Sequence, residues 1–306
     1  MHTGDDPVQD FTACAGSQPT TRPSQPSAPA ARVPRFSHVV VIVMENKDCG
    51  DVIGNPEAPY INSLAGRSAL ATESFAITHP SLPNYLALTG GSTFGIRSDC
   101  TTCHVPATNL VDQLEAAGLS WKAYMESMPA PCFRGTKAGL YAKKHNPFLY
   151  YDNISQRPAR CANVVPLDHL TADVRRRKLP AFSWITPNLC DDMHNRNCGI
   201  RAGDKFLSRL LPPLLHAVGS NGVVFLTWDE GESSSTEGCC EKAGGGHVAT
   251  IVAGPLAQPG ARSSLPYDHY SLLRTIEDGF GVPRLRSAAC PCTPPLTALL
   301  RDPPQR

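Results

Sequence analysis

Two kinds of apolar pattern alternate along the chain between residues 35 and 286. Continuous apolar runs, such as the one from Val39 to Val43, are typical of parallel strands that are covered on both faces. Segments with apolar residues at helical spacing lie between these runs. Leu110, Val111 and Leu114 form one such segment, and Gly118 is a suitable helix stop after it. This alternation predicts one α/β domain with a mainly parallel, doubly wound sheet.

These runs define the elements that we expect. The predicted strands are His38–Met44, Ser74–Thr78, Trp121–Met125, Phe182–Thr186, Val223–Trp228 and Ala249–Ala253. The predicted helices are Tyr60–Ala65, Leu82–Thr89, Asn109–Ala117, Leu167–Lys178, Asp204–Val218 and Tyr270–Phe280. The folded domain is expected to span residues 36–288. Residues 1–35 are rich in Pro, Ser, Ala and Thr and predict a flexible tail, and the proline-rich residues 289–306 predict an irregular C-terminal tail.

Charge and hydropathy exclude several classes of protein. The chain has 306 residues, with 28 basic and 27 acidic side chains and a formal net charge of +1. A near-neutral chain lacks the field expected of a general nucleic-acid binder. The longest apolar run, from Val39 to Met44, is far shorter than the roughly 20 residues of a membrane-spanning helix. We therefore expect no nucleic-acid partner and no transmembrane segment.

The 12 cysteines predict disulfides and an exported protein, either secreted or held at the cell surface or in the periplasm. The local spacings favour the pairs Cys100–Cys103 and Cys190–Cys198, with Cys132–Cys161 as a looser suggestion, and leave the other pairings open. The segment Cys100 to His104 also matches the C-x-x-C-H pattern of haem attachment. No second axial ligand accompanies it, so a disulfide is the better interpretation.

The N-terminal residues leave the route of export open. Met1 to Asp10 is polar and acidic and has no apolar segment of the kind found in signal peptides. The stretch from Phe11 to Cys14 faintly resembles a lipoprotein cleavage site, so whether Cys14 carries a lipid stays open.

Polar side chains gather where predicted strands end. Glu45 and Asn46 follow the first strand, and Asp229 and Glu230 follow the strand that ends at Trp228. Ligands of open α/β sheets bind beyond the carboxyl ends of the strands, so these groups are expected to converge. The remaining candidates follow or precede other strands and are His79, Ser81, Asn188, Asp191, Asp192, His194 and His247.

The residue types narrow the chemistry. Carboxylate and amide oxygens are hard ligands that suit a divalent cation, and a cation keeps neighbouring carboxylates ionised. Ser81 precedes a predicted helix whose N-terminus favours an anion. A metal-activated hydroxyl beside an anion site indicates attack on phosphate or sulfate esters. His79, His194 and His247 are expected to hold nonbridging oxygens or to protonate the leaving group.

Each feature alone also has a structural interpretation. Ser81 is a suitable helix N-cap, Glu45 and Asn46 suit a loop start and cap, and Asp229 with Glu230 suits a solvated turn. The joint placement at several strand ends, rather than any single motif, favours a site.

Five segments of the chain carry a resemblance to a known family. They are Val41 to Asn46, Thr78 to Tyr85, Thr186 to Asn188, Thr227 to Gly231 and Gly245 to Val248. These segments resemble the bacterial phosphoesterase family, which contains secreted acid phosphatases and phospholipases C within the wider alkaline-phosphatase-like fold. The resemblance runs from about His38 to Leu285, and a sixth segment, from Tyr267 to Asp278, is similar to the closing helix of the family.

The resemblance implies roles for individual residues and a three-layer α/β/α sandwich. Ser81 would be the nucleophile, His79, His194 and His247 would surround the phosphoryl group, and Asn84, Asn188 and Asp192 would support substrate binding. The chain departs from the family pattern at Asn195, where an acidic residue is frequent. Glu45, Asn46, Asp229 and Glu230 would hold one divalent metal ion. Calcium, magnesium, manganese and iron all accept these ligands.

The implied function is a secreted, metal-dependent acid phosphatase that forms a phosphoserine intermediate. Its substrates would be phosphorylated small molecules or phosphoinositide headgroups, including phosphatidylinositol 3-phosphate, with peripheral membrane contact left open. A phosphodiesterase of the phospholipase C type is the alternative on the same scaffold. A non-catalytic surface protein is a further alternative, but binding alone does not need a complete set of metal ligands and nucleophile.

Overall fold

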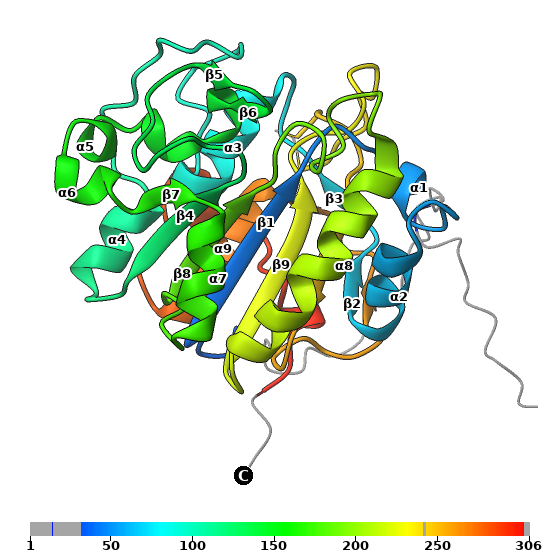
Figure 1. Ribbon diagram of the computed structural model, residues 1–306. Helices are drawn as coiled ribbons and strands as arrows, with labels where there is room; N and C mark the ends of the chain where they lie inside the picture. Colours follow the sequence, from blue (N-terminus) through cyan, green and yellow to red (C-terminus); the bar gives the residue numbers. More distant parts are fainter. Residues whose placement is uncertain (1–13, 15–31, 241–242, 303–306) are drawn as a thin grey trace, which may run out of the picture.

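The computed structural model describes residue 14, residues 32–240 and residues 243–302. Its centre is an eight-stranded sheet in the order β11-β2-β10-β9-β1-β8-β4-β7 (Figure 1). β10 runs antiparallel to β2 and β9, and the other described neighbours in this sheet are parallel. The strands, in chain order, are β1 (His38–Met44), β2 (Ala69–Ala71), β4 (Trp121–Met125), β7 (Val164–Pro166), β8 (Phe182–Thr186), β9 (Gly222–Trp228), β10 (Thr250–Ala253) and β11 (Arg262–Ser263).

Two short strand pairs and the helices complete the fold. β3 (Ser74–Phe75) pairs with β12 (Tyr267–Asp268), and β5 (Lys137–Ala138) forms a hairpin with β6 (Tyr141–Ala142). The α-helices are α1 (Cys49–Val52), α2 (Pro59–Arg67), α3 (Ser81–Gly90), α4 (Leu110–Ala116), α5 (Asp152–Ser155), α6 (Pro158–Cys161), α7 (Asp168–Arg175), α8 (Gly199–Ala217) and α9 (His269–Phe280). The 3₁₀ turns include η2 (Lys143–His145), η3 (Pro147–Leu149), η4 (Arg286–Ala289) and η5 (Thr297–Leu299).

Side-chain alternation along β1 divides the core into two layers. Val39, Val41 and Val43 face a cluster that includes residues of α3, α4 and α9, whereas Val40 and Ile42 face a cluster that includes residues of α2, α7 and α8. Strand residues point alternately to opposite faces, so a strand that is apolar at every position is buried on both. Figure 1 shows α2, α7 and α8 in front of the sheet. The predicted three-layer α/β/α architecture is confirmed.

The predicted helices are all present, with ends that differ by a few residues. Three strands of the central sheet, β2, β7 and the two-residue β11, were not predicted. β2 has the sequence Ala-Leu-Ala, which carries a helical rather than a strand preference. β7 ends in Pro166 at the sheet edge, where proline is tolerated. The predicted strand Ser74–Thr78 is reduced to β3, which lies outside the central sheet.

The disulfides include all the pairs suggested by spacing: Cys100–Cys103, Cys190–Cys198 and Cys132–Cys161. Since Cys100 and Cys103 are bonded to each other, neither thiol is available for haem. Cys14 is bonded to Cys49, so its sulfur is likewise not free for a lipid. The other bonds are Cys239–Cys240 and Cys290–Cys292.

The structure describes only parts of the two expected tails. Residues 1–13 and 15–31, which fall in the expected N-terminal tail, lie outside the described residues. Residues 290–302 contain the 3₁₀ turn η5 and are packed: Leu296 and Leu299 are buried, and the N–H of Arg301 donates to the carbonyl of Leu256. The division into one domain and two tails stays a prediction. Within the described residues, no helix combines the length and the apolar character needed to cross a membrane.

Candidate active site

The register of the sheet brings the first carboxylates together. β1 and β9 are parallel and pair Met44 with Trp228, so the next residues, Glu45 and Asp229, leave the sheet at the same point. The N–H of Asp229 donates to the carbonyl of Met44 across 2.9 Å, which holds the two loops in contact. Both carboxylates are fully buried. They therefore occupy the crevice at the carboxyl edge of the sheet, where such folds bind ligands.

Ser81 joins these carboxylates from another element. It is the first residue of α3 and is fully buried. Its hydroxyl lies 3.1 Å from Glu45 Oε2 and 3.2 Å from Glu230 Oε1 and donates toward both. The N-terminus of a helix carries unpaired N–H groups and a partial positive charge, which favour an anion. The hydroxyl thus lies between a carboxylate cluster and the positive end of α3, where the N–H of Leu82 is paired with Asp99 Oδ1 at 3.0 Å.

Oxygen atoms of the cluster face one another with few donors between them. The amide oxygen of Asn46 points at Glu230 and Glu45, and only a rotated amide would donate to these carboxylates, across 3.1 and 3.2 Å. Asp229 Oδ1 accepts the N–H of Asn46 at 3.2 Å. The other oxygen, Oδ2, is buried and forms no hydrogen bond to any described residue. Such a set of converging acceptors is what a bound cation requires.

Electrostatics lead to the same conclusion. Burial, followed by the charges of Asp229 and Asp192, raises the pKa of Glu45 well above its ordinary value. Burial and the neighbouring Glu230 raise the pKa of Asp229 in the same way. A divalent cation would offset this repulsion and keep the carboxylates ionised. The oxygen set of Glu45, Asn46, Asp229 and Glu230 therefore fits a divalent metal.

His79 lies on the outer side of Glu230. Its Nδ1 is 2.5 Å from Glu230 Oε2, and its Nε2 is 2.7 Å from the carbonyl of Ser235. The hydrogen bond to Glu230 is the main cause that raises the pKa of His79. Both ring nitrogens are engaged, which fixes the orientation of the imidazole beside the cluster.

Two residues of the cluster were not singled out from the sequence. His145 is buried between Glu45 Oε2, 3.2 Å from its Nε2, and Asp192 Oδ2, 3.3 Å from its Nδ1. Tyr85 stacks on the His145 ring and donates a short hydrogen bond to Glu45. Tyr85 follows Ser81 by four residues on α3, and this spacing is a signal that could have identified it. His145 has no such signal, because its segment is far from the other candidates in the sequence.

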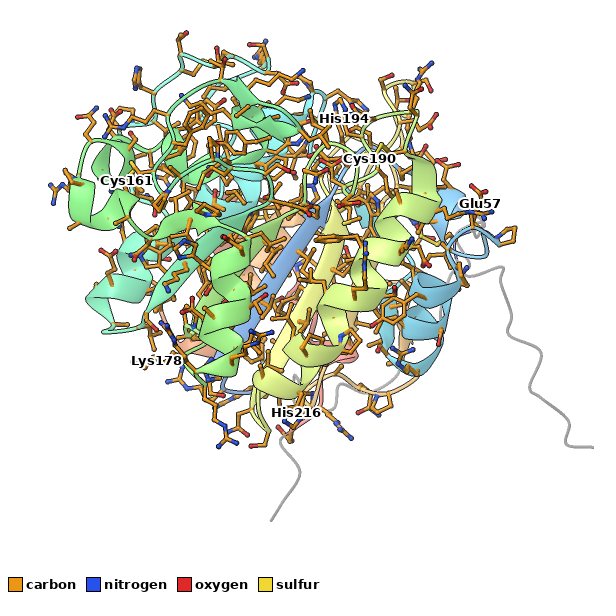
Figure 2. The ribbon with its side chains drawn as sticks, in the orientation of Figure 1. Glu57, Cys161, Lys178, Cys190, His194 and His216 are labelled. Carbon is orange, nitrogen blue, oxygen red and sulfur yellow. A yellow bond between two sulfur atoms is a disulfide. The ribbon has the colours of Figure 1, made fainter. Side chains whose placement is uncertain are left out.

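His194 also lines the cluster. One ligand atom of each of Glu45, His145 and His194 lies within 4.8 Å of the others, and the His194 and His145 ring centroids are 5.5 Å apart. The N–H of His194 donates to Asp192 Oδ1 at 2.8 Å, so Asp192 holds the loop and contacts His145 as well. Figure 2 shows His194 and Cys190 at the same edge of the molecule, opposite Lys178 and His216.

Other predicted site residues form contacts outside this cluster. Asn84 Oδ1 accepts the N–H groups of Ile77 and Thr78, which braces the loop before Ser81. Asn188 Oδ1 accepts the N–H groups of Cys190 and Asp191 and so shapes the loop that carries His194. These two amides position loops.

The contacts of His247 also lie outside the cluster around Ser81. Its ring stacks on Phe75, its Nε2 is 2.7 Å from the carbonyl of Thr72, and its Nδ1 is 3.8 Å from Glu237. A role for this imidazole at the phosphoryl group stays a prediction.

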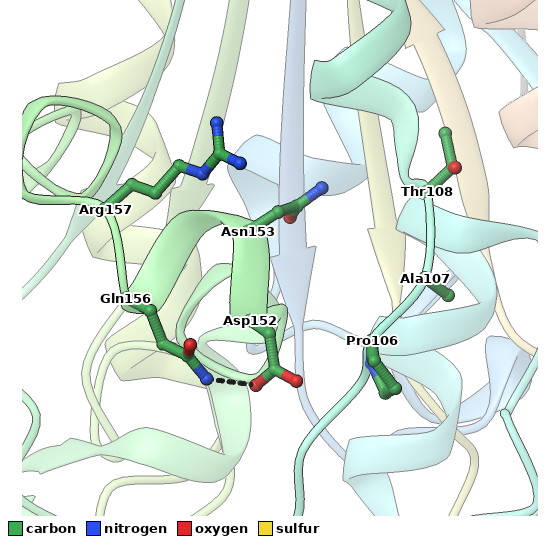
Figure 3. Close-up of a pocket in the computed structure, with 7 residues that line it drawn as sticks. All are labelled: Pro106, Ala107, Thr108, Asp152, Asn153, Gln156 and Arg157. Atoms are coloured by element: carbon green, nitrogen blue, oxygen red, sulfur yellow. Dashed lines mark hydrogen bonds between the residues drawn. The ribbon is translucent and has the colours of Figure 1, made fainter.

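A separate pocket of about 570 Å³ lies between the segment that precedes α4 and helix α5 (Figure 3). Asp152 and Gln156 are hydrogen bonded to each other at its rim across 3.0 Å. None of the candidate site residues lines it. The lining residues are Pro106, Ala107, Thr108, Asp152, Asn153, Gln156 and Arg157.

The chain is similar in sequence to known phosphoesterases and phosphatases. The model of the Phosphoesterase family matches residues 55–283. The chain is 34% identical over 275 residues to the phosphatidylinositol-3-phosphatase of Mycobacterium tuberculosis, covering 89% of this chain and 86% of that protein. It is 33% identical to a probable acid phosphatase of Kluyveromyces lactis, covering 82% of this chain and 59% of that protein.

A solved structure supports the fold. A protein of the alkaline phosphatase superfamily from Vibrio parahaemolyticus superimposes with a TM-score of 0.59 at 13% identity, covering 93% of this chain and 77% of that one. At this identity the likeness concerns the architecture alone.

Proposed function

The chain belongs to the phosphoesterase family and is a hydrolase of phosphoric ester bonds, and on that premise we propose that it is a metal-dependent phosphomonoesterase with Ser81 as nucleophile. The observation that carries the proposal is the buried Ser81 hydroxyl, which begins α3 and donates to Glu45 and Glu230. Ser81 does not cap the helix, because the N-cap of α3 is Pro80, and its hydroxyl bonds carboxylates rather than the backbone N–H groups that a cap would bond.

Glu45, Asn46, Asp229 and Glu230 would hold the divalent cation, which supplies charge stabilisation and lowers the pKa of a neighbouring hydroxyl. Glu45 and Glu230 accept hydrogen bonds from Ser81 and are placed to take its proton. Ser81 Oγ then bonds to phosphorus as the bond to the leaving oxygen breaks, and the leaving oxygen takes up, directly or through water, the proton that the carboxylate accepted from Ser81. Water cleaves the phosphoserine, and its proton restores the hydroxyl.

The substrate class follows from the relatives. The mycobacterial relative is named a phosphatidylinositol-3-phosphatase, and we extend phosphatidylinositol 3-phosphate to this chain as a candidate substrate. The six disulfides among the described residues support an exported protein, secreted or attached to the cell surface.

The test is the release of p-nitrophenol from its phosphate monoester and from the bis-ester, at acid and neutral pH, with and without a chelator. We expect monoester cleavage that is lost with the metal. Ser81→Ala should lower kcat by more than about 1,000-fold and leave metal content unchanged. Ser208→Ala is the matched control, since the Ser208 hydroxyl bonds the backbone of its own helix α8. Preferential cleavage of the bis-ester would replace the proposal with the phosphodiesterase alternative.

A further inference from the structure

Lys144 is a cation at the candidate active site that the sequence does not single out. It belongs to the 3₁₀ turn η2, and its side chain is only 22% exposed. Its Nζ lies 2.8 Å from Asp99 Oδ2 and 3.3 Å from His194 Nε2. Asp99 and His194 are distant in the sequence, so the lysine connects two separate loops.

Asp99 ties the lysine to the helix that carries the serine. Asp99 Oδ1 accepts the N–H of Leu82, the second residue of α3, at 3.0 Å. The same carboxylate therefore contacts the first turn of α3 and Lys144. This bridge fixes the ammonium group next to the turn that begins with Ser81, and it keeps the lysine charged.

The contact between Lys144 and His194 determines where the imidazole carries its proton. A lysine ammonium has three donors and no acceptor. At 3.3 Å, His194 Nε2 can pair with it only through its lone pair, which places the single proton of the neutral ring on Nδ1.

The other nitrogen of His194 is the donor that this tautomer leaves available. Nδ1 is buried and forms no hydrogen bond within the described part of the chain. Its ring lies in the cluster with Glu45 and His145, next to the site expected for the phosphoryl group. A buried N–H without an acceptor is costly, so its natural partner is an oxygen of the bound substrate.

We propose that Lys144, anchored by Asp99, is a positioning residue that holds His194 as a neutral imidazole with its proton on Nδ1. In this form His194 donates a hydrogen bond to a phosphoryl oxygen and does not protonate the leaving group. The inference rests on the proposed phosphomonoesterase function and chooses between two roles that the sequence leaves open for this histidine.

The tautomer is tested first without any substrate. Two-bond ¹H–¹⁵N correlation spectra of histidine-labelled protein, with His194→Asn used to assign the ring, should show the Nδ1–H form of His194. Lys144→Met should alter this signature, while Lys143→Met should not. Lys143 is the matched control because it is the adjacent lysine of η2 and donates to the carbonyl of Thr101. An Nε2–H or doubly protonated ring in the unsubstituted protein would overturn the proposal.

The role of the histidine is tested with aryl phosphates whose leaving groups differ in pKa. An asparagine places its amide N–H close to the position of Nδ1–H, so His194→Asn should keep more activity than His194→Ala. Its kcat/KM should fall by the same factor for every leaving group. A loss that grows with leaving-group pKa would identify His194 as the general acid and contradict the proposal.

Variants of Lys144 test its positioning role through kcat/KM. Lys144→Met should lower kcat/KM by about 10–100-fold, the effect typical of a lost partner that orients a catalytic histidine, and Lys144→Arg should restore part of it. Equal losses in Lys144→Met and Lys143→Met would contradict a specific role. If the unsubstituted protein cleaves no phosphomonoester, the proposed function fails, while the spectra still decide the tautomer.

Discussion

The protein buries carboxylates in two regions, and the two differ in their neighbours. At the carboxyl edge of the sheet, Glu45 and Asp229 are crowded with other acidic groups and with the Ser81 hydroxyl. On α9, Glu277 is equally buried, but its Oε1 accepts the N–H of Leu285. Burial raises the pKa of all three carboxyls.

The difference shows how a functional carboxylate can be distinguished from a structural one. A lone buried carboxyl such as Glu277 can remain protonated and take part in packing. A cluster of buried carboxyls that repel one another gains a favourable energy only when a cation is supplied. Burial alone therefore does not mark a site, and neither does one unpartnered oxygen, since Glu277 Oε2 and Asp229 Oδ2 both lack a hydrogen bond to the described residues. The distinguishing feature is the convergence of several buried carboxyls.

We expect the largest effect from a test that replaces one carboxylate in each region. Asp229→Asn should lower bound divalent metal and phosphatase activity together, the activity by at least about 100-fold, because a charged ligand is lost. Asp278→Asn, next to Glu277 on α9, should leave both unchanged, since Asp278 pairs with Arg284. Metal analysis by mass spectrometry and kcat/KM measure the two effects. Unchanged metal content in Asp229→Asn would move the metal site elsewhere.

A smaller effect is expected from Tyr85→Phe, which removes the hydroxyl that donates to Glu45. Loss of one hydrogen bond to a charged group costs about 1.5–3 kcal/mol, so kcat/KM should fall by roughly 10–100-fold. Tyr151→Phe is the control: its hydroxyl bonds Thr89 at the other end of α3. Equal activity in the two variants would remove Tyr85 from the site.

Metal removal should lower the thermal stability of the protein, and this decrease should depend on Asp229 and not on Glu277. A ligand present at 100 times its Kd stabilises the folded state by about 2.7 kcal/mol, so chelation should lower Tm by roughly 5 °C. Glu277→Gln should show the same decrease, and Asp229→Asn should show little of it. Calorimetry with and without the chelator measures the difference. A decrease that persists in Asp229→Asn would mean that the stabilising ion binds another site.

The sequence predicted the parts of the site that follow long apolar strands. Glu45 and Asp229 could be identified because β1 and β9 are unmistakable and parallel strands end at one edge. His145 and Lys144 could not, since they belong to a 3₁₀ turn whose position depends on tertiary packing. The same limit explains β2, whose short Ala-Leu-Ala sequence becomes a strand only through its neighbours β10 and β11.

The smallest expected effect concerns Glu277, where burial raises the pKa to about 8 from an ordinary value of 4.5. Below pH 4.5 the folded and unfolded states both hold the proton, so the carboxyl costs nothing. As pH rises from 4.5 to 8 the unfolded state ionises first, and the folded state is progressively disfavoured. Glu277→Gln should therefore raise the free energy of unfolding by about 1–3 kcal/mol at pH 8 and leave it nearly unchanged at pH 4.

Denaturant unfolding across this pH range measures the effect, with activity followed in parallel. Glu57→Gln is the matched control, because Glu57 is an exposed carboxylate at the edge of the molecule in Figure 2. A stability gain that is independent of pH would mean that the glutamine improves packing rather than removing a buried ionisation. A loss of metal would mean that α9 and the carboxyl edge are coupled, and the contrast between the two regions would then fail.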